Sequence, residues 1–161
     1  MASLDKTRGF TLIELMVTVA VLAIVLSIAI PSFSAIILNN RLSTTADELQ
    51  SSLQLARSEA VKRKKTITLC RADASFEKCA ESGTDWSLGW LLLSGGEVLK
   101  IWEPSSGLVI EGPATSAMIL GTGMPQSSYT FKVNAPQCSN GVQHVLEMNR
   151  IGSLKARKGA C

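Results

Sequence analysis

The residue with the clearest chemical consequence is Glu14, the single charge in an apolar segment that covers residues 10–30. A carboxylate in a membrane-spanning helix costs about 2.5–3.5 kcal/mol on insertion scales, so it indicates a function and needs a partner. If the chain is cut between Gly9 and Phe10, the new α-amino group is a cation one helical turn from Glu14. In an assembly of such helices, Glu14 of one chain could neutralise the Phe10 amine of the next. The other interpretation is a carboxylate that reaches the membrane interface.

The four cysteines, Cys70, Cys79, Cys138 and Cys161, all follow the apolar segment. An even number of cysteines on one side of a membrane segment indicates disulfides in an oxidising compartment. Three pairings exist, and we favour Cys70–Cys79 with Cys138–Cys161, because each bond closes a short local loop. The alternative is four reduced, buried thiols. A zinc site is not expected, because there is no CxxC pair and His144 is the only histidine.

Sequence signatures of catalysis are missing. The chain contains no P-loop, no HExxH and no GxSxG. His144 alternates with Val145 in an expected strand, and we interpret it as a structural side chain rather than a general base. We therefore expect a protein that is not an enzyme, with no catalytic, cofactor-binding or metal-binding residues, no cofactor and no small-molecule substrate.

Two basic clusters could bind an anionic partner. Residues 62–65, Lys-Arg-Lys-Lys, lie at an expected helix end, where cations interact favourably with the helix dipole and keep the turn soluble. The second cluster contains four cations: Arg150, Lys155, Arg157 and Lys158. If Cys138 and Cys161 are bonded, this segment is a cationic surface loop that could hold a phosphate backbone by charge. An ordinary solvated tail is the other interpretation.

The bulk composition allows one domain with a core plus an appendage. The chain has 161 residues, 46% of them hydrophobic, and a net charge of +3, too small for the whole molecule to act as a polycation. As a helix, residues 10–30 span about 30 Å, the thickness of a bilayer's hydrocarbon core. Lys6 and Arg8 precede this span and favour a cytoplasmic N-terminus. No small-residue cleavage site follows the span, which argues against a secretory signal.

One long helix is expected from about residue 11 to residue 63. Pro31 can be accommodated within it, since such breaks are tolerated in membrane helices. Its second half carries an apolar stripe at spacings of three and four: Leu42, Ala46, Leu49, Leu53, Ala56 and Ala60. This amphipathic pattern predicts one partner surface. A coiled-coil dimer is the alternative, but the stripe is short and includes three alanines.

Short strands with turn signals follow the helix. The expected strands are residues 66–70, 89–93, 98–102, 108–110, 117–120, 129–133 and 142–148. Ser94-Gly95-Gly96 predicts a hairpin turn between two of them. We expect an antiparallel sheet that covers the amphipathic half of the helix. Three tryptophans are interpreted as packing residues of this sheet: Trp86, Trp90 and Trp102.

Residues 8–14, Arg-Gly-Phe-Thr-Leu-Ile-Glu, resemble the processing site of type IV pilins and type II secretion pseudopilins. In that family a membrane aspartyl peptidase cuts after the glycine and N-methylates the new terminal residue. The resemblance implies cleavage after Gly9, methylation of Phe10 and a register-setting role for Glu14. It also implies the α+β type IV pilin fold, a long N-terminal helix packed on an antiparallel sheet domain. The expected parts are a cleaved leader (1–9), a transmembrane and filament-core helix (10–38) and a periplasmic head (39–161).

Residues 49–63, with a strand after them, resemble the GspH/FimT group of minor pilins and pseudopilins. This resemblance implies a minor pilin of a type IV pilus that helps prime assembly and enters the filament, in twitching motility, adhesion or DNA uptake. One alternative is a FimT-like DNA-binding pilin for natural transformation, although residues 155–158 lack the Gly-Arg start of the GRxR motif that binds DNA in some members. The other alternative is a GspH-like minor pseudopilin of type II secretion.

The same resemblance implies where the protein resides and what it contacts. The expected location is the bacterial inner membrane, in a single pass with a cytoplasmic N-terminus, followed by the pilus or a periplasmic pseudopilus. The expected partners are other minor and major pilins, the prepilin peptidase, the inner-membrane assembly platform, the membrane itself and, in the FimT-like reading, DNA.

Overall fold

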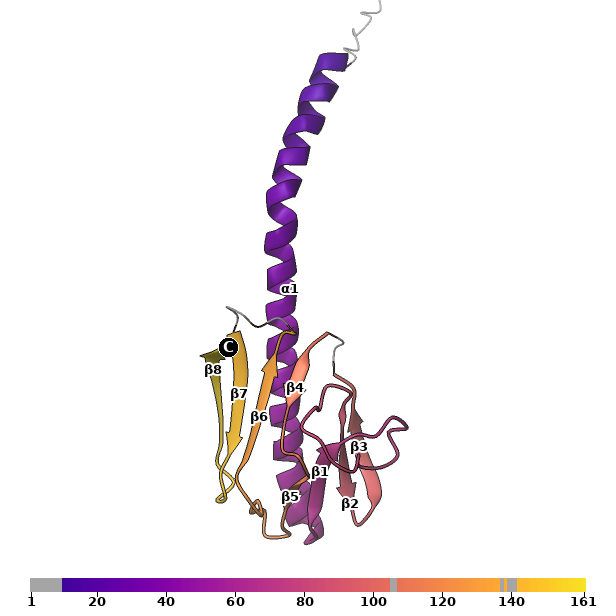
Figure 1. Cartoon of the computed structure of the whole chain (residues 1–161), viewed down its shortest axis with the longest axis vertical. Helices are drawn as coiled ribbons and strands as arrows, with labels where there is room; N and C mark the ends of the chain where they lie inside the picture. Colours follow the sequence, from indigo (N-terminus) through magenta and orange to yellow (C-terminus); the bar gives the residue numbers. More distant parts are fainter. Residues whose placement is uncertain (1–9, 105–106, 137, 139–141) are drawn as a thin grey trace, which may run out of the picture. The chain divides into compact units, whose positions relative to one another are not determined.

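The computed structural model describes residues 10–104, 107–136, 138 and 142–161, which form two compact units, Met1–Leu38 and Asn39–Cys161. The second unit is called the head below. Within the described residues, one helix precedes eight strands (Figure 1). The elements are α1 (Leu12–Arg63), β1 (Ile67–Arg71), β2 (Trp90–Ser94), β3 (Glu97–Trp102), β4 (Val109–Glu111), β5 (Ala117–Ile119), β6 (Tyr129–Asn134), β7 (Val142–Met148) and β8 (Leu154–Ala160).

Helix α1 begins directly after Thr11 and continues through Pro31 to Arg63, as the sequence predicts. The Thr11 hydroxyl accepts a hydrogen bond of 3.3 Å from the backbone N–H of Glu14. A threonine that accepts from the third helical residue is an N-cap, because it satisfies one of the free amides of the first turn. At the other end Lys64 adopts a left-handed conformation, with φ of 53°, which ends the helix.

The apolar stripe of α1 is buried inside the head. All six of its members are covered: Leu42, Ala46, Leu49, Leu53, Ala56 and Ala60. They share one core with side chains from the strands, among them Ile67, Phe131 and Leu146. The predicted partner surface is therefore the chain's own sheet layer, and a coiled-coil dimer is not needed to cover the stripe.

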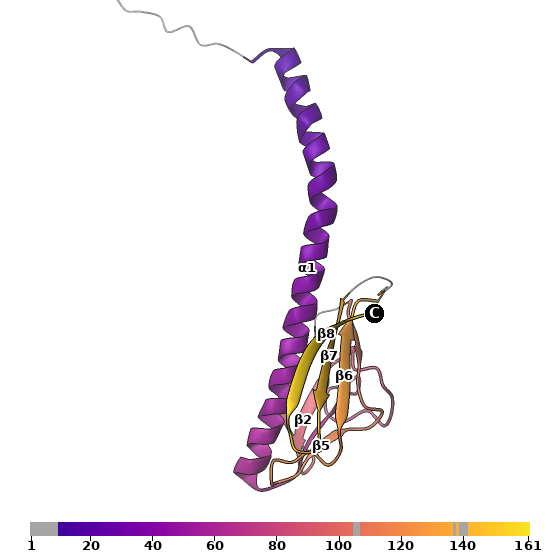
Figure 2. The ribbon, with the colours of Figure 1, turned by 90° about the vertical axis from the view of Figure 1, so that its left-hand side faces the viewer.

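The strands form two four-stranded antiparallel sheets, in the orders β3-β2-β1-β5 and β4-β6-β7-β8, where a single sheet was expected. Figures 1 and 2 show both beside the C-terminal half of α1. The division arises between β4 and β5, which pair with different partners, β6 and β1. Gly112 and Pro113 separate these two strands, and proline has no N–H to donate to a ladder.

Strand β8 was not predicted. The expected cationic loop is a strand that pairs with β7 over seven residues, from Met148↔Leu154 to Val142↔Ala160. Its sequence, LKARKGA, contains no β-branched or aromatic side chain, so its local pattern does not favour a strand. The strand forms because a tight turn returns the chain alongside β7, so the interpretation of this segment as a loop was wrong.

Two disulfides close the pairs Cys70–Cys79 and Cys138–Cys161, with Cα–Cα distances of 5.6 and 5.5 Å. The first holds a loop against the outer face of the first sheet, where Cys70, Leu91 and Leu93 form a second, small core. These are the pairs that the short loop lengths favoured.

The tryptophans pack as expected. Trp86 and Trp90 are fully buried and Trp102 is partly buried. Trp86 meets Phe131 edge to face, with ring centroids 5.0 Å apart, and Trp90 stacks on Trp102 at 6.3 Å. Such aromatic pairs contribute to core stability beyond the area that they bury.

Candidate functional site

The N-terminal unit presents its apolar side chains on every side of the helix. Every side chain that the structure describes between residues 10 and 38 is exposed, and Phe10 is 84% exposed. By length and composition α1 is apolar enough to cross a membrane. A helix that is hydrophobic all round requires an apolar environment, either lipid or other helices. The expected cleavage residue, Gly9, lies outside the described residues.

Glu14 is the exception on this apolar surface. It lies in the first turn of α1, where its own N–H is capped by Thr11. The positive end of the helix dipole favours a carboxylate at this position. Among the side chains described in this unit, Glu14 takes part in no ion pair.

The hydroxyls further along the same segment are satisfied within the helix. Thr18 donates to the carbonyl of Leu15 at 2.8 Å, and Ser27 donates to that of Ile24 at 2.7 Å. These groups can therefore enter an apolar environment with their hydrogen bonds made. The Glu14 carboxylate cannot enter an apolar environment without cost, since its charge needs a partner from outside the helix.

The C-terminal basic residues do not form one surface. Strand alternation puts Lys155 and Arg157 on one face of β8 and Lys158 on the other. Arg157 is paired with Glu147 on β7, with Nη2 and Oε1 2.7 Å apart, so its charge is largely compensated. Arg150 lies in the turn before β8. The structure therefore brings Lys155 and Arg157 together and separates Lys158 from them.

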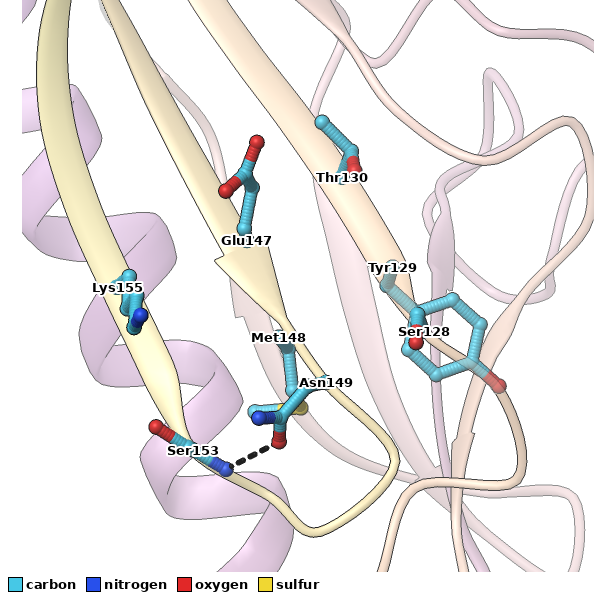
Figure 3. A pocket seen from close by; sticks show the side chains of 8 residues that line it. All are labelled: Ser128, Tyr129, Thr130, Glu147, Met148, Asn149, Ser153 and Lys155. Atoms are coloured by element: carbon cyan, nitrogen blue, oxygen red, sulfur yellow. Dashed lines mark hydrogen bonds between the residues drawn. The ribbon is translucent and has the colours of Figure 1, made fainter.

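A shallow groove of about 300 Å³ lies on this same face of β6, β7 and β8 (Figure 3). Eight residues line it: Ser128, Tyr129, Thr130, Glu147, Met148, Asn149, Ser153 and Lys155. Asn149 also has a local role, because its side-chain oxygen accepts a hydrogen bond of 2.8 Å from the N–H of Ser153. The lining holds hydroxyls and both signs of charge, and it contains no histidine or cysteine.

His144 is half-buried on β7, on the face of the sheet that looks toward α1. Burial lowers the pKa of its imidazole, Lys158 lowers it further, and Asp47 on α1 opposes the shift. The neutral form is therefore favoured in the folded protein. Among the residues that the structure describes, no group of three histidine, cysteine or acidic side chains is arranged to hold a metal ion.

A contact that sequence reasoning missed joins Arg57 of α1 to the β7–β8 turn. Its Nη1 donates a hydrogen bond of 3.0 Å to the carbonyl oxygen of Gly152. The signal that could have indicated this turn is Asn149-Arg150-Ile151-Gly152, since asparagine at the first position and glycine at the fourth are typical of type I turns. Nothing local in the sequence could indicate that Arg57 reaches it.

Residues 45–152 match the protein family described as type II transport protein GspH, and residues 4–30 match the prokaryotic N-terminal methylation motif. No curated protein matches the chain in sequence.

Solved structures show the same fold. The type IV minor pilin FimU of Pseudomonas aeruginosa is 21% identical to this chain and has been solved in two crystal forms. The first form gives a TM-score of 0.55, over 72% of this chain and 92% of FimU. The second gives a TM-score of 0.58, over 74% of this chain and 90% of FimU. The minor pseudopilin EpsH of the Vibrio cholerae type 2 secretion system is 14% identical, with a TM-score of 0.53, over 73% of this chain and 96% of EpsH. These likenesses confirm the expected type IV pilin fold. The chain belongs to the family of the type II transport protein GspH, and it carries the prokaryotic N-terminal methylation motif.

Proposed function

We propose that this protein is a minor pilin of a type IV pilus, a structural subunit rather than an enzyme, which helps to prime assembly and is then incorporated in the filament. Its precursor would be cut after Gly9 and methylated on Phe10 by the prepilin peptidase. The observation that carries the proposal is the contrast between the two halves of α1. The second half has one apolar face, which the head buries, whereas the first half is apolar, exposed and charged only at Glu14.

This contrast has a simple physical consequence. Before assembly, lipid can cover residues 10–30, and after assembly neighbouring helices of the same kind can do so. Cleavage leaves an ammonium group on Phe10, which is itself costly to bury among apolar helices. Glu14 of a neighbouring subunit can neutralise it. Because one acid and one amine pair at a single axial offset, the pair also fixes the register between subunits.

The test replaces Glu14 in the full chain and measures two quantities, the amount in the membrane fraction and the amount in sheared filaments. We expect Glu14→Val to leave the membrane amount unchanged and to reduce the filament amount strongly, because the amine of the adjacent subunit loses its counter-charge. The matched control is Thr18→Val in the same segment, whose hydroxyl bonds only to its own helix. Normal incorporation of the Glu14→Val chain would refute the register role.

A pseudopilin of type II secretion would have the same features, so a genetic experiment must distinguish it from a pilus subunit. The two disulfides fit both the pilus and the pseudopilus, since the cell exterior and the periplasm are both oxidising. Deletion of the gene is expected to abolish or shorten surface pili and to leave type II secretion of exoproteins intact. The opposite pattern would assign the protein to the secretion system.

The FimT-like reading has a test of its own. The separation of Lys158 from Lys155, and the pairing of Arg157 with Glu147, weaken the case for a phosphate-binding surface on β8. We expect the full chain in detergent to give no gel shift with double-stranded DNA at low salt. A shift that weakens when Lys155, Arg157 and Lys158 are changed to Gln, with a smaller salt dependence, would support DNA binding instead.

A further inference from the structure

The C-terminal end of α1 and two turns of the sheet layer lie at the same end of the head (Figures 1 and 2). One turn joins β5 to β6 and contains Gly123 and Met124, and the other joins β7 to β8 and contains Ile151 and Gly152. Arg57 touches both turns. A methyl group added at Gly123 would lie 3.6 Å from its Cγ, and one at Gly152 would lie 2.9 Å from its Cζ. The two turns therefore meet around one side chain of α1.

Three large aliphatic side chains are exposed at this end. Ile151 is 71% exposed, and Val61 and Met124 are each 52% exposed. Val61 adjoins the first turn, because a methyl group added at Gly123 would lie 2.7 Å from its Cγ2. Single exposed apolar residues are common on protein surfaces and need no explanation. Three such residues gathered around two turns form a cluster, which suggests a contact with a partner.

Ile151 is the clearest of the three, because its turn does not need it. Asn149 builds the turn, accepting hydrogen bonds from the N–H groups of Ile151 and Ser153 at 3.2 and 2.8 Å, and Gly152 supplies the positive φ of 79°. Turn positions normally carry polar residues. An exposed isoleucine therefore contributes little to the fold and is free to contact a partner.

Cations lie within four residues of Val61 and of Ile151 along the chain. Lys64 and Lys65 follow the last turn of α1, and Arg150 precedes Ile151. None of the three forms an ion pair within the part of the chain that the structure describes, whereas Lys62 and Arg63 are both paired with Glu59. This end of the head therefore carries exposed apolar side chains together with cations, and protein interfaces typically combine apolar contacts with charged or polar ones.

We propose that this surface, Val61, Met124, Ile151, Lys64, Lys65 and Arg150, docks an acidic and apolar surface of a different pilin-like subunit. The proposal rests on the proposed function, since it requires a filament partner. A protein fits better than a single-stranded nucleic acid, because the surface has aliphatic side chains where bases would need aromatic ones to stack on. The hydrogen bond from Arg57 to Gly152 holds the second turn in place, which lowers the cost of binding.

The test uses the full chain in its own host, with a photo-crosslinking phenylalanine analogue in place of Ile151. The matched control puts the same analogue at Leu88, a 51% exposed side chain in the loop between β1 and β2. We expect an adduct with one pilin-like protein from position 151 and none from position 88, with the crosslink mapped to an acidic region of that protein. Lys65→Glu should lower the adduct yield about tenfold, and changing the mapped acid of the partner to Lys should restore it.

Several outcomes would overturn the docking surface. These are no adduct at position 151, equal adducts at both positions, an adduct only with another copy of this chain, or one only with nucleic acid or lipid. If Lys65→Glu leaves the adduct yield unchanged, charge complementarity does not contribute to docking and that part of the proposal is refuted. Filament incorporation, measured in the same cells, separates the two proposals: a chain that is incorporated but not crosslinked refutes only the docking surface, and a chain that never enters filaments refutes the proposed function.

Discussion

Arg57 on the helix and Gly152 in the last hairpin are 95 residues apart in sequence and are joined by a hydrogen bond of 3.0 Å. The bond ties α1 to the β7–β8 turn and so to the edge of the second sheet. Gly152 has φ of 79°, a conformation that glycine adopts without strain. Side chain and turn therefore support each other at the end of the head.

Arg57→Ala is expected to lower the free energy of unfolding by about 1 kcal/mol, because the turn loses its hydrogen bond to the helix. Chemical denaturation followed by circular dichroism measures the change. Arg63→Ala is the matched control, since Arg63 pairs only with Glu59 in the same helix and should matter less. An equal decrease in the free energy of unfolding of both variants would show that the hydrogen bond to Gly152 does not stabilise the head.

Gly112→Ala is expected to destabilise the head by about 1–3 kcal/mol through overpacking. The added methyl group would lie 2.6 Å from Nε1 of Trp86 and 2.9 Å from Cδ1 of Phe131, two rigid rings in the core. Gly159→Ala is the control, because its methyl group would meet Gln143 only at ordinary contact distances, 3.7 Å and beyond. Thermal unfolding of the two variants should differ clearly, and similar melting temperatures would contradict the packing described here.

Removing the Cys138–Cys161 disulfide is expected to lower the free energy of unfolding more than removing Cys70–Cys79, because it closes the longer loop. Replacing both cysteines by Ala should lower stability by about 2.5 kcal/mol for Cys70–Cys79, with a separation of 9 residues, and by about 3.5 kcal/mol for Cys138–Cys161, with a separation of 23. The reason is the larger chain entropy that the longer loop regains on unfolding. Denaturation of the two double variants checks the order, and unchanged stability in either would show that its bond does not constrain the unfolded chain.

The head is expected to lose stability as the pH falls below about 6.5, through His144. Because burial and Lys158 lower the pKa of His144 in the folded state, the unfolded chain binds a proton first as the pH falls. The stability that neutral His144 contributes is fully present above the pKa of this residue in the unfolded chain. It is lost as the pH falls toward the lower pKa that His144 has in the folded protein.

His144→Gln should flatten this dependence between pH 7 and pH 5, the range in which an ordinary histidine titrates. The melting temperature measured across this range in both proteins is the readout. A slope that is the same in the variant would assign the dependence to other groups.

The helix and most strands could be predicted because their patterns are local. The spacing of Leu42, Leu49 and Leu53 indicates a buried helical face, and alternation in residues 129–133 indicates a strand. The Thr11–Glu14 cap likewise involves residues three positions apart. Features of this kind depend on the sequence within a few turns or strand residues.

The remaining features depend on contacts distant in sequence. Strand β8 exists because β7 pairs with it, and the choice of β1 and β6 as partners for β5 and β4 divides the strands into two sheets. The basic C-terminal cluster could be recognised by composition. Its separation by strand alternation could not, because the strand itself was not predicted.

The proposed function requires a mature chain that begins at Phe10, with its amine free to pair with Glu14 of a neighbouring subunit. Intact-mass and N-terminal peptide analysis of the protein, purified from membranes and filaments of its own host, tests this directly. The predicted result is a chain that starts at N-methylated Phe10 and retains the apolar segment. A protein that still begins at Met1, or one that has lost residues 10–30, would contradict it.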